Sequence, residues 1–288
     1  KEMKDYVMFS FELYKNNPYW IPPIIAEELE TFDKTKNPAL QTAEAHFYLA
    51  YKDNKIVGKI AAIINWEEVN LLGKRKARFG WFDAIDDIEV TKALLDKVEE
   101  LGRKHNMDHM EGPMGFSNLD KVGILSEGFD QMGNMITWYS LPYYITHFEQ
   151  LGFIKEKEYT ESDFSFNGIN PEPFQKASEL IKKRYELRSL NFTKTKDIMP
   201  YVDKMFDLFN ETYAKLQSFV PINDIQKAYF KKKYISFINP EFIKFIVDKN
   251  DNMIAFAIVM PGFAQALKKA NGKLFPFGFY HLLQARKH

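Results

Sequence analysis

The sequence predicts a mixed α/β fold (α+β, with a mixed sheet) built as two successive units, and three observations lead to this prediction. Apolar residues recur at helical spacing in some segments, whereas other segments are rich in β-branched and aromatic residues. The strand-like stretches form two hairpin patterns, at residues 46–64 and 242–260, each with a turn rich in Lys, Asp and Asn. With 288 residues, the chain also exceeds the usual size of a single core, which favours about two domains.

The first predicted unit begins with two short helices. Tyr6, Phe9 and Leu13 share a helical face, and Pro18 follows soon after that helix. A second helix is predicted through Leu29. The elements expected next are strands 46–51, 56–64 and 77–82, a helix beginning after residue 87, strand and turn material at 107–138, a helix at 142–151 and a strand at 153–166.

An acidic cluster lies before the predicted helix that follows residue 87. It consists of Asp83, Asp86, Asp87 and Glu89. Negative charge is favoured near a helix N-terminus by the helix dipole. We therefore assign this cluster to the start of the helix.

The second predicted unit repeats this order in outline. Its expected elements are helix 171–184, an extended stretch 185–192, helices 198–216 and 224–234, and strands 242–247 and 253–260. Polar and helix-breaking residues gather at 167–171, as in a linker. The predicted domains are therefore residues 1–168 and residues 169–288.

The overall charge and composition exclude several classes of protein. The 39 basic and 39 acidic residues give a formal net charge of zero, so no global field attracts nucleic acid or an anionic membrane. There is no cysteine, which excludes disulfides and thiolate chemistry. No apolar run approaches the ~20 residues that span a bilayer. We expect a cytoplasmic protein with no nucleic-acid or membrane partner.

Familiar catalytic motifs are missing from the sequence. It contains no GxxxxGK[ST] loop, no strand followed by GxGxxG, no HExxH and no GxSxG. His105 and His109 are four residues apart, but the residues between them are typical of a helix end. Because a histidine near a helix C-terminus is also favoured by the dipole, we expect no metal site.

The order of elements and several short phrases resemble the GNAT superfamily of acyl-CoA N-acyltransferases. The stretch 148–154, which reads FEQLGFI, resembles the late helix-to-strand corner of that fold. The phrases WIPP, GPM, GILSEGFD, PYY and GKLFPFG, at residues 20–23, 112–114, 123–130, 142–144 and 272–278, resemble a bacterial family of paired GNAT-like proteins. The resemblance extends over nearly the whole chain and implies an acyltransferase that uses acetyl-CoA or another acyl-CoA as co-substrate.

Two departures from the GNAT pattern bear on this activity. The family holds the coenzyme pyrophosphate in a glycine-rich turn at a helix N-terminus, whereas the corresponding stretch 84–87 is acidic and lacks glycine. In the second unit the sequence reaches His288 before the strand that would precede this turn, so we expect that unit to be incomplete. Phe148 stands where many members carry a tyrosine that protonates the leaving thiolate.

Three residues are weak candidates for catalysis. Tyr143 and Tyr144 open the helix after Pro142 and could present a hydroxyl, although core packing is an equally good interpretation. Glu111 could serve as a general base for an amine. Its simplest interpretation is a solvated surface residue.

Four further residues are candidates for substrate binding. Ser117, Asn118 and Asp120 follow a Gly-Pro turn and could point into a cleft, but local turn capping is the simpler interpretation. Trp138 could line an apolar pocket, or it could belong to the core. The basic run 231–233 is interpreted as a solvated helix face.

The leading hypothesis is an N-acyltransferase that moves an acyl group from a coenzyme A thioester to a small-molecule or peptide amine. The alternative is a binding or assembly protein that keeps the fold without the chemistry. A third possibility, nucleic-acid binding, is disfavoured by the neutral charge. The acceptor, the acyl group and the oligomeric state are not encoded in these patterns.

Overall fold

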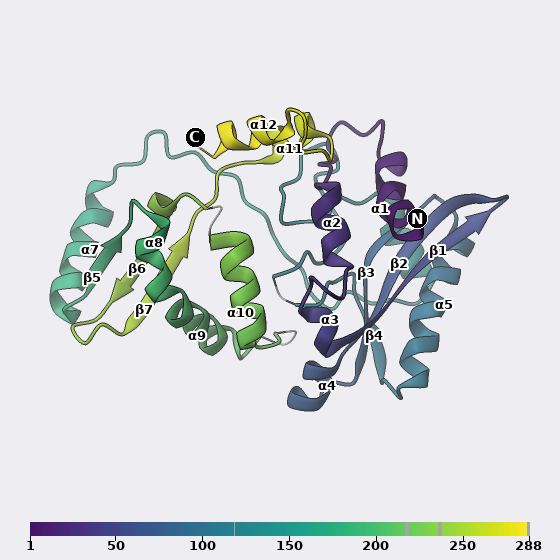
Figure 1. Ribbon diagram of the computed structural model, residues 1–288, viewed down its shortest axis with the longest axis horizontal. Helices are drawn as coiled ribbons and strands as arrows, with labels where there is room; N and C mark the ends of the chain where they lie inside the picture. The colour runs from purple at the N-terminus through teal and green to yellow at the C-terminus, as the bar shows by residue number, and fades with distance from the viewer. Residues whose placement is uncertain (118, 217–218, 236–237, 287–288) are drawn as a thin grey trace. The chain divides into compact units, whose positions relative to one another are not determined.

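The computed structural model describes residues 1–117, 119–216, 219–235 and 238–286, and a mixed α/β fold is confirmed (Figure 1). Contacts divide the chain into two compact units. Unit 1 comprises Lys1–Phe153, Leu216–Tyr229 and Pro261–His288, and unit 2 comprises Ile154–Lys215 and Phe230–Met260. The division into domains 1–168 and 169–288 was drawn from a repeated order of elements in the sequence, and it stays a prediction.

Unit 1 is built on a four-stranded mixed sheet in the order β1-β2-β3-β4. Its strands are β1 (Ala43–Lys52), β2 (Lys55–Asn65), β3 (Lys76–Ala84) and β4 (His109–Glu111). The first three strands pair antiparallel, and β4 pairs parallel to β3 over three residue pairs, from Lys76↔His109 to Arg78↔Glu111. Strand β3 continues to Ala84 after β4 has ended, and the Met114 N–H after β4 still donates to the Phe79 carbonyl at 2.7 Å.

The hairpin predicted at residues 46–64 is confirmed. Asp53 and Asn54 connect β1 to β2, and both have positive φ, 51° and 61°. Two consecutive positive φ values define a type I′ turn, whose twist matches that of the flanking strands. Asn and Asp tolerate this conformation better than most residues, so the local sequence fixes the hairpin.

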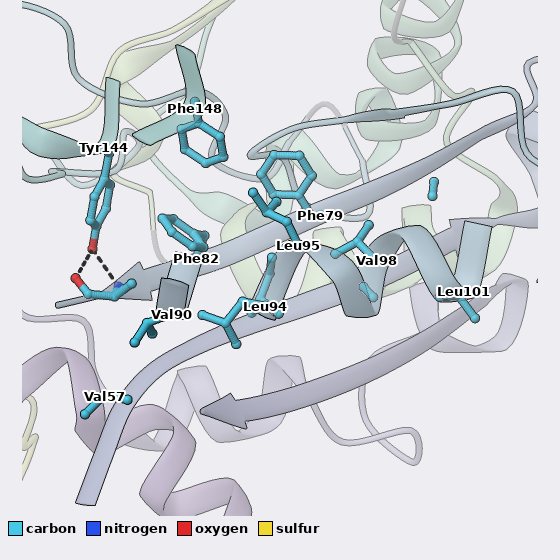
Figure 2. Close-up of a cluster of buried hydrophobic side chains, with 14 of the residues drawn as sticks. Val57, Phe79, Phe82, Val90, Leu94, Leu95, Val98, Leu101, Tyr144 and Phe148 are labelled. Carbon is cyan, nitrogen blue, oxygen red and sulfur yellow. Dashed lines mark hydrogen bonds between the residues drawn. The ribbon is translucent and has the colours of Figure 1, made fainter. Parts of the chain in front are cut away.

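The side chains of β2 alternate between two cores, one on each face of the sheet. Ile60 and Ile64 pack into a cluster with α5 (Ile88–Lys104) and α6 (Tyr143–Gln150), part of which is shown in Figure 2. Ile63 packs on the other face against residues of α1 (Glu2–Leu13). The two-residue period of a strand directs successive side chains to opposite faces, and helices cover both.

The remaining helices of unit 1 are short. They are α2 (Ile25–Thr31), α3 (Ala39–Thr42), α4 (Trp66–Leu72), α10 (Asp224–Phe230, in this unit through Tyr229), α11 (Ala264–Ala270) and α12 (Gly278–Ala285). Ile21 and Ile24 form a third apolar cluster with Phe263 and Leu267. This cluster fixes the position of the chain segment just before α2.

Unit 2 contains an antiparallel sheet in the order β5-β6-β7, with a core on one face. Phe192 packs at 5.5 Å, between ring centroids, against the fully buried Phe245. The hairpin predicted at residues 242–260 is confirmed. The elements of unit 2 are α7 (Glu172–Tyr185), β5 (Arg188–Asn191), α8 (Thr195–Ile198), α9 (Val202–Tyr213), β6 (Ile243–Val247), β7 (Met253–Ile258), the 3-10 helices Met199–Tyr201 and Pro240–Phe242, and a π-helical turn Lys231–Ile235.

Some predicted elements differ from the structure. The strand expected at 153–166 is wrong, because this segment pairs with no strand among the described residues and Ile154 and Phe164 stay exposed. Helices α4, α11 and α12 were not predicted. In the sequence, α4 is indicated by Asn65, whose side chain caps the helix by accepting from the Glu68 N–H at 3.1 Å. In the described chain, no helix combines the length and the apolar character that crossing a membrane requires.

A buried network of charges fixes the start of β3. Glu68 on α4 accepts from Arg78 Nε at 2.8 Å and pairs with Lys76 Nζ at 3.0 Å, and Lys76 also pairs with Glu111 on β4 at 2.5 Å. Glu68, Lys76 and Arg78 are at most 2% exposed. Two cations therefore face two anions out of water, a balance that removing either anion would break.

We expect Glu68→Gln to lower the free energy of unfolding by about 3 to 5 kcal/mol, because it leaves two buried cations with one anion. Urea denaturation followed by circular dichroism measures this change. Glu99→Gln, which removes an exposed partner of Arg103, is the matched control and should cost under about 1 kcal/mol. Equal losses for the two variants would contradict a stabilising role for the buried network.

Candidate functional site

A pocket lies in unit 1 between the end of β3 and the segment after β4. Its walls come from α1, the loop before α2, strands β2 and β3, the segment after β4 and the start of α6. The cavity has a volume of about 60 Å³, enough for several water-sized groups. Its charged residues are Glu28, Lys59, Asp83 and Lys121, and its aromatic residues are Tyr14, Trp20, Trp81, Phe82, Trp138, Tyr139 and Tyr144.

A buried ion pair lies at one wall of this pocket. Lys59 on β2 and Asp83 on β3 are direct cross-strand partners. Their Nζ and Oδ2 atoms are 3.5 Å apart, and their side chains are 5% and 11% exposed. The Lys59 ammonium also lies 5.0 Å from the centre of the Tyr6 ring, where a cation is attracted to the π electrons.

Three hydroxyl groups converge on the carboxylate of Asp83. Ser10 donates to Oδ2 at 2.6 Å, Tyr14 donates to Oδ1 at 2.8 Å, and the Tyr144 hydroxyl lies 3.4 Å from Oδ1. The Tyr144 oxygen also accepts from the Ala84 N–H at 2.9 Å, one of the bonds drawn in Figure 2. These hydroxyl groups and the Lys59 ammonium thus surround the carboxylate of Asp83.

The two tyrosines remain donors over the whole physiological pH range. Burial raises the pKa of Tyr14 and of Tyr144 well above their ordinary value, and the negative charge of Asp83 raises both further. A phenol with a raised pKa keeps its proton at neutral pH. The carboxylate of Asp83 is therefore held by protonated hydroxyls and does not face a phenolate.

A β-bulge shapes the wall next to Asp83. Lys59 pairs with Asp83 and Ala61 pairs with Gly80, so Trp81 and Phe82 together face the single residue Ile60. Trp81 has φ 46°, a left-handed conformation that is rare for a bulky residue. The extra residue of a bulge is left out of the ladder, so this wall presents backbone groups beside the pocket.

Two further charged side chains line the pocket without a partner of their own. Glu28 on α2 and Lys121 on the segment after β4 are half-buried. Neither side chain makes a hydrogen bond or ion pair within the described residues. Burial lowers the pKa of Lys121, and the charges of Glu28 and Asp83 oppose this shift. Lys121 and Glu28 are thus a cation and an anion of the pocket that form no ion pair within the described residues.

The residues proposed from sequence fall both inside and outside this pocket. Tyr144 and Trp138 line it. Tyr143 lies beside it, donates to the Ala84 carbonyl at 2.7 Å, and has a raised pKa through burial. Glu111 pairs with Lys76 in the buried network, and Phe148 is in the core between Phe79 and Phe82. Their catalytic roles stay predictions.

The polar residues after the Gly-Pro turn bond mainly to one another. The Asp120 carboxylate accepts from the Ser117 N–H at 2.8 Å, which is the turn capping considered above. Neither residue is among those that line the pocket. Asn118 lies outside the described residues. Among the described residues, no group of three or more His, Asp or Glu side chains could hold a metal ion.

The sequence analysis did not identify Lys59 and Asp83 as residues of a functional site. Asp83 was assigned to a helix start, but it belongs to β3, and Asp87 is the side chain that caps α5, accepting from the Glu89 N–H at 3.1 Å. One signal was available: Lys59 is the single charged residue in the predicted apolar strand 56–64. Charged residues in buried strands are rare unless paired.

Comparisons with known proteins give two relatives along the sequence. The chain is 28% identical to Protein YghO of Escherichia coli (strain K12) over 287 residues, covering 98% of this chain and 71% of that protein. It is 25% identical to the bacterial ceramide synthase of Caulobacter vibrioides (strain NA1000 / CB15N) over 285 residues, covering 98% of this chain and 73% of that protein. No protein-family model matches the chain.

Two solved structures are also similar. One is a probable acetyltransferase, with a TM-score of 0.33 and 12% identity over 58% of this chain and 95% of that one. The other is a tandem GNAT protein from the clavulanic acid biosynthesis pathway, solved without AcCoA, with a TM-score of 0.44 and 11% identity over 88% of this chain and 69% of that one.

We expect Tyr14→Phe to lower the free energy of unfolding by about 1.5 to 3 kcal/mol, because it removes a buried hydrogen bond to a carboxylate. Tyr51→Phe, which removes a hydroxyl from a side chain that is 59% exposed, is the control and should change stability by less than about 0.5 kcal/mol. Urea titrations of both variants give these values. If Tyr14→Phe matches the control, the hydroxyl does not hold Asp83.

Proposed function

We propose that the protein is an N-acyltransferase that moves an acyl group from a coenzyme A thioester to an amine. Three observations support this proposal: the sequence resembles GNAT acyltransferases, 98% of the chain aligns with a protein named ceramide synthase, and unit 1 contains the pocket described above. A ceramide is an amide of a fatty acid with an amino alcohol, so N-acylation is the shared chemistry.

The observation that carries the proposal is an unpaired carboxylate in the same pocket as a β-bulge. Glu28 has no ion-pair or hydrogen-bond partner of its own within the described residues, so its carboxylate is available to an incoming ammonium group. Asp83 is already engaged by Ser10, Tyr14 and Lys59. Of the two carboxylates, Glu28 is therefore the one that we assign as the base.

The reaction follows from these groups in two steps. Glu28 takes a proton from the ammonium form of the acceptor, and the neutral nitrogen attacks the thioester carbonyl carbon, forming the C–N bond and a tetrahedral oxyanion. Backbone N–H groups at the bulge of Trp81 and Phe82 stabilise that oxyanion. The C=O bond then re-forms, the C–S bond breaks and its electron pair leaves with the sulfur as a thiolate, and the nitrogen loses its second proton to water, which leaves a neutral amide.

The leaving group lessens the need for a strong acid in this pocket. A thiol has a pKa of about 8.5, so coenzyme A can depart as a thiolate and take a proton from water. Phe148 has no proton to give, and burial raises the pKa of Tyr144, which makes it a weaker acid. In this mechanism Tyr144 positions Asp83 and the end of β3, and protonation of the thiolate follows departure.

We expect Glu28→Gln to lower kcat for amine-dependent release of coenzyme A by about 10²- to 10⁴-fold, because the amide cannot accept the proton. A thiol-trapping assay with acetyl-CoA and longer acyl-CoA donors, over a panel of amines, measures this rate. The matched control is Glu127→Gln, an exposed glutamate that does not line the pocket, and it should keep the wild-type rate.

Two results would contradict the proposal. Full activity in Glu28→Gln would remove Glu28 from the reaction. Saturable binding of an acyl-CoA with no amine-dependent release from any donor would favour the alternative, a binding or assembly protein.

A further inference from the structure

The pocket holds two lysine ammonium groups whose hydrogen-bonding capacity is unused. Each ammonium group has three N–H donors and no acceptor. Lys59 makes a long ion pair of 3.5 Å to Asp83 and a contact with the Tyr6 ring, but no hydrogen bond within the described residues. Lys121 makes neither a hydrogen bond nor an ion pair there.

Within the described residues, Asp83 forms an ion pair with Lys59 and none with Lys121. Its two oxygens already accept from Ser10 and Tyr14, with Tyr144 close by. Polar groups in protein interiors nearly always have a partner, and burying an ammonium group without one is costly. Neither lysine has a hydrogen-bond acceptor within the described residues, and a ligand in the cavity would supply one.

The two lysines are also electrostatically coupled. Burial lowers the pKa of Lys121, the charges of Glu28 and Asp83 oppose this shift, and the positive charge of Lys59 adds to it. An acidic group of a ligand would supply hydrogen-bond acceptors to both lysines.

We propose that Lys59 and Lys121 form a subsite for an acidic group, a carboxylate or a phosphate, on the amine that accepts the acyl chain. This identity of the acceptor rests on the proposed acyltransferase function. Glu28 then receives the ammonium end of the same molecule, and the two lysines receive its acidic end. The cavity of about 60 Å³ has room for such a group in place of water.

The pocket carries a carboxylate and two ammonium groups, and this arrangement favours some amines over others. A zwitterionic acceptor matches one free carboxylate and two ammonium groups, whereas a plain amine leaves the lysine donors unpaired. A site built to hydrogen-bond a substrate group rejects the analogue that lacks it, because its own polar groups stay unsatisfied. The acceptor class is therefore amino acids or amino phosphates.

The test measures binding without any acyl donor, so that it stands apart from catalysis. Ethanolamine, β-alanine and O-phosphoethanolamine are similar short amines that carry a hydroxyl, a carboxylate or a phosphate. Isothermal titration of each against the protein should show at least about tenfold tighter binding for one or both acidic amines than for ethanolamine. Comparison of the two acidic ligands identifies the preferred group.

Lys121→Met should abolish this preference. Lys55→Met, at an exposed lysine at the start of the same strand as Lys59, is the matched control and should keep the preference. Circular dichroism shows whether each variant is folded, and Lys121→Gln provides a second, polar substitution at the same site.

Three outcomes would overturn the subsite. The first is equal affinity for all three amines. The second is an acidic preference that survives both substitutions of Lys121. The third is a loss of coenzyme A affinity in Lys121→Met with no acidic preference in the wild-type protein, which would assign the lysine to the phosphates of the donor. Acidic binding without turnover would instead retain the subsite and reject the acyltransferase.

Discussion

The cross-strand pair between Lys59 and Asp83 is the interaction on which the pocket depends. It places opposite charges on adjacent strands in a buried sheet, where each charge requires the other. Asp83 then accepts from the hydroxyls of Ser10 on α1 and of Tyr14 at the C-cap of that helix. One carboxylate thus ties two strands and a helix together, and the pocket forms around the groups that it holds.

The opposite end of β3 is fixed by a separate set of charges. Arg78 and Lys76 engage Glu68, and Lys76 also reaches Glu111 on the parallel strand β4. This network lies where β3 and β4 are paired, and the pocket lies at the other end of β3. The strand is therefore anchored by balanced charge at the end that pairs with β4, whereas Asp83 at its other end lines the pocket.

Local patterns predicted much of the fold but little of the site. The Asp53-Asn54 turn, the face formed by Val90, Leu94 and Val98, and the two hairpins follow from short-range rules of spacing and turn chemistry. The pocket depends on residues far apart in sequence, such as Ser10 and Asp83. No local period reports that two such residues meet, so Asp83 was assigned to the following helix, and the strand at 153–166 was predicted without a partner to pair with.

The central claim is that the pocket orients a charged amine between Glu28 on one side and Lys59 with Lys121 on the other. A crystal structure of the protein with O-phosphoethanolamine or β-alanine bound tests it most directly. We predict acidic oxygens within hydrogen-bond distance, about 2.7 to 2.9 Å, of both lysine Nζ atoms, with the amine directed at the carboxylate of Glu28. A ligand bound in the reverse orientation, or outside this pocket, would contradict the account.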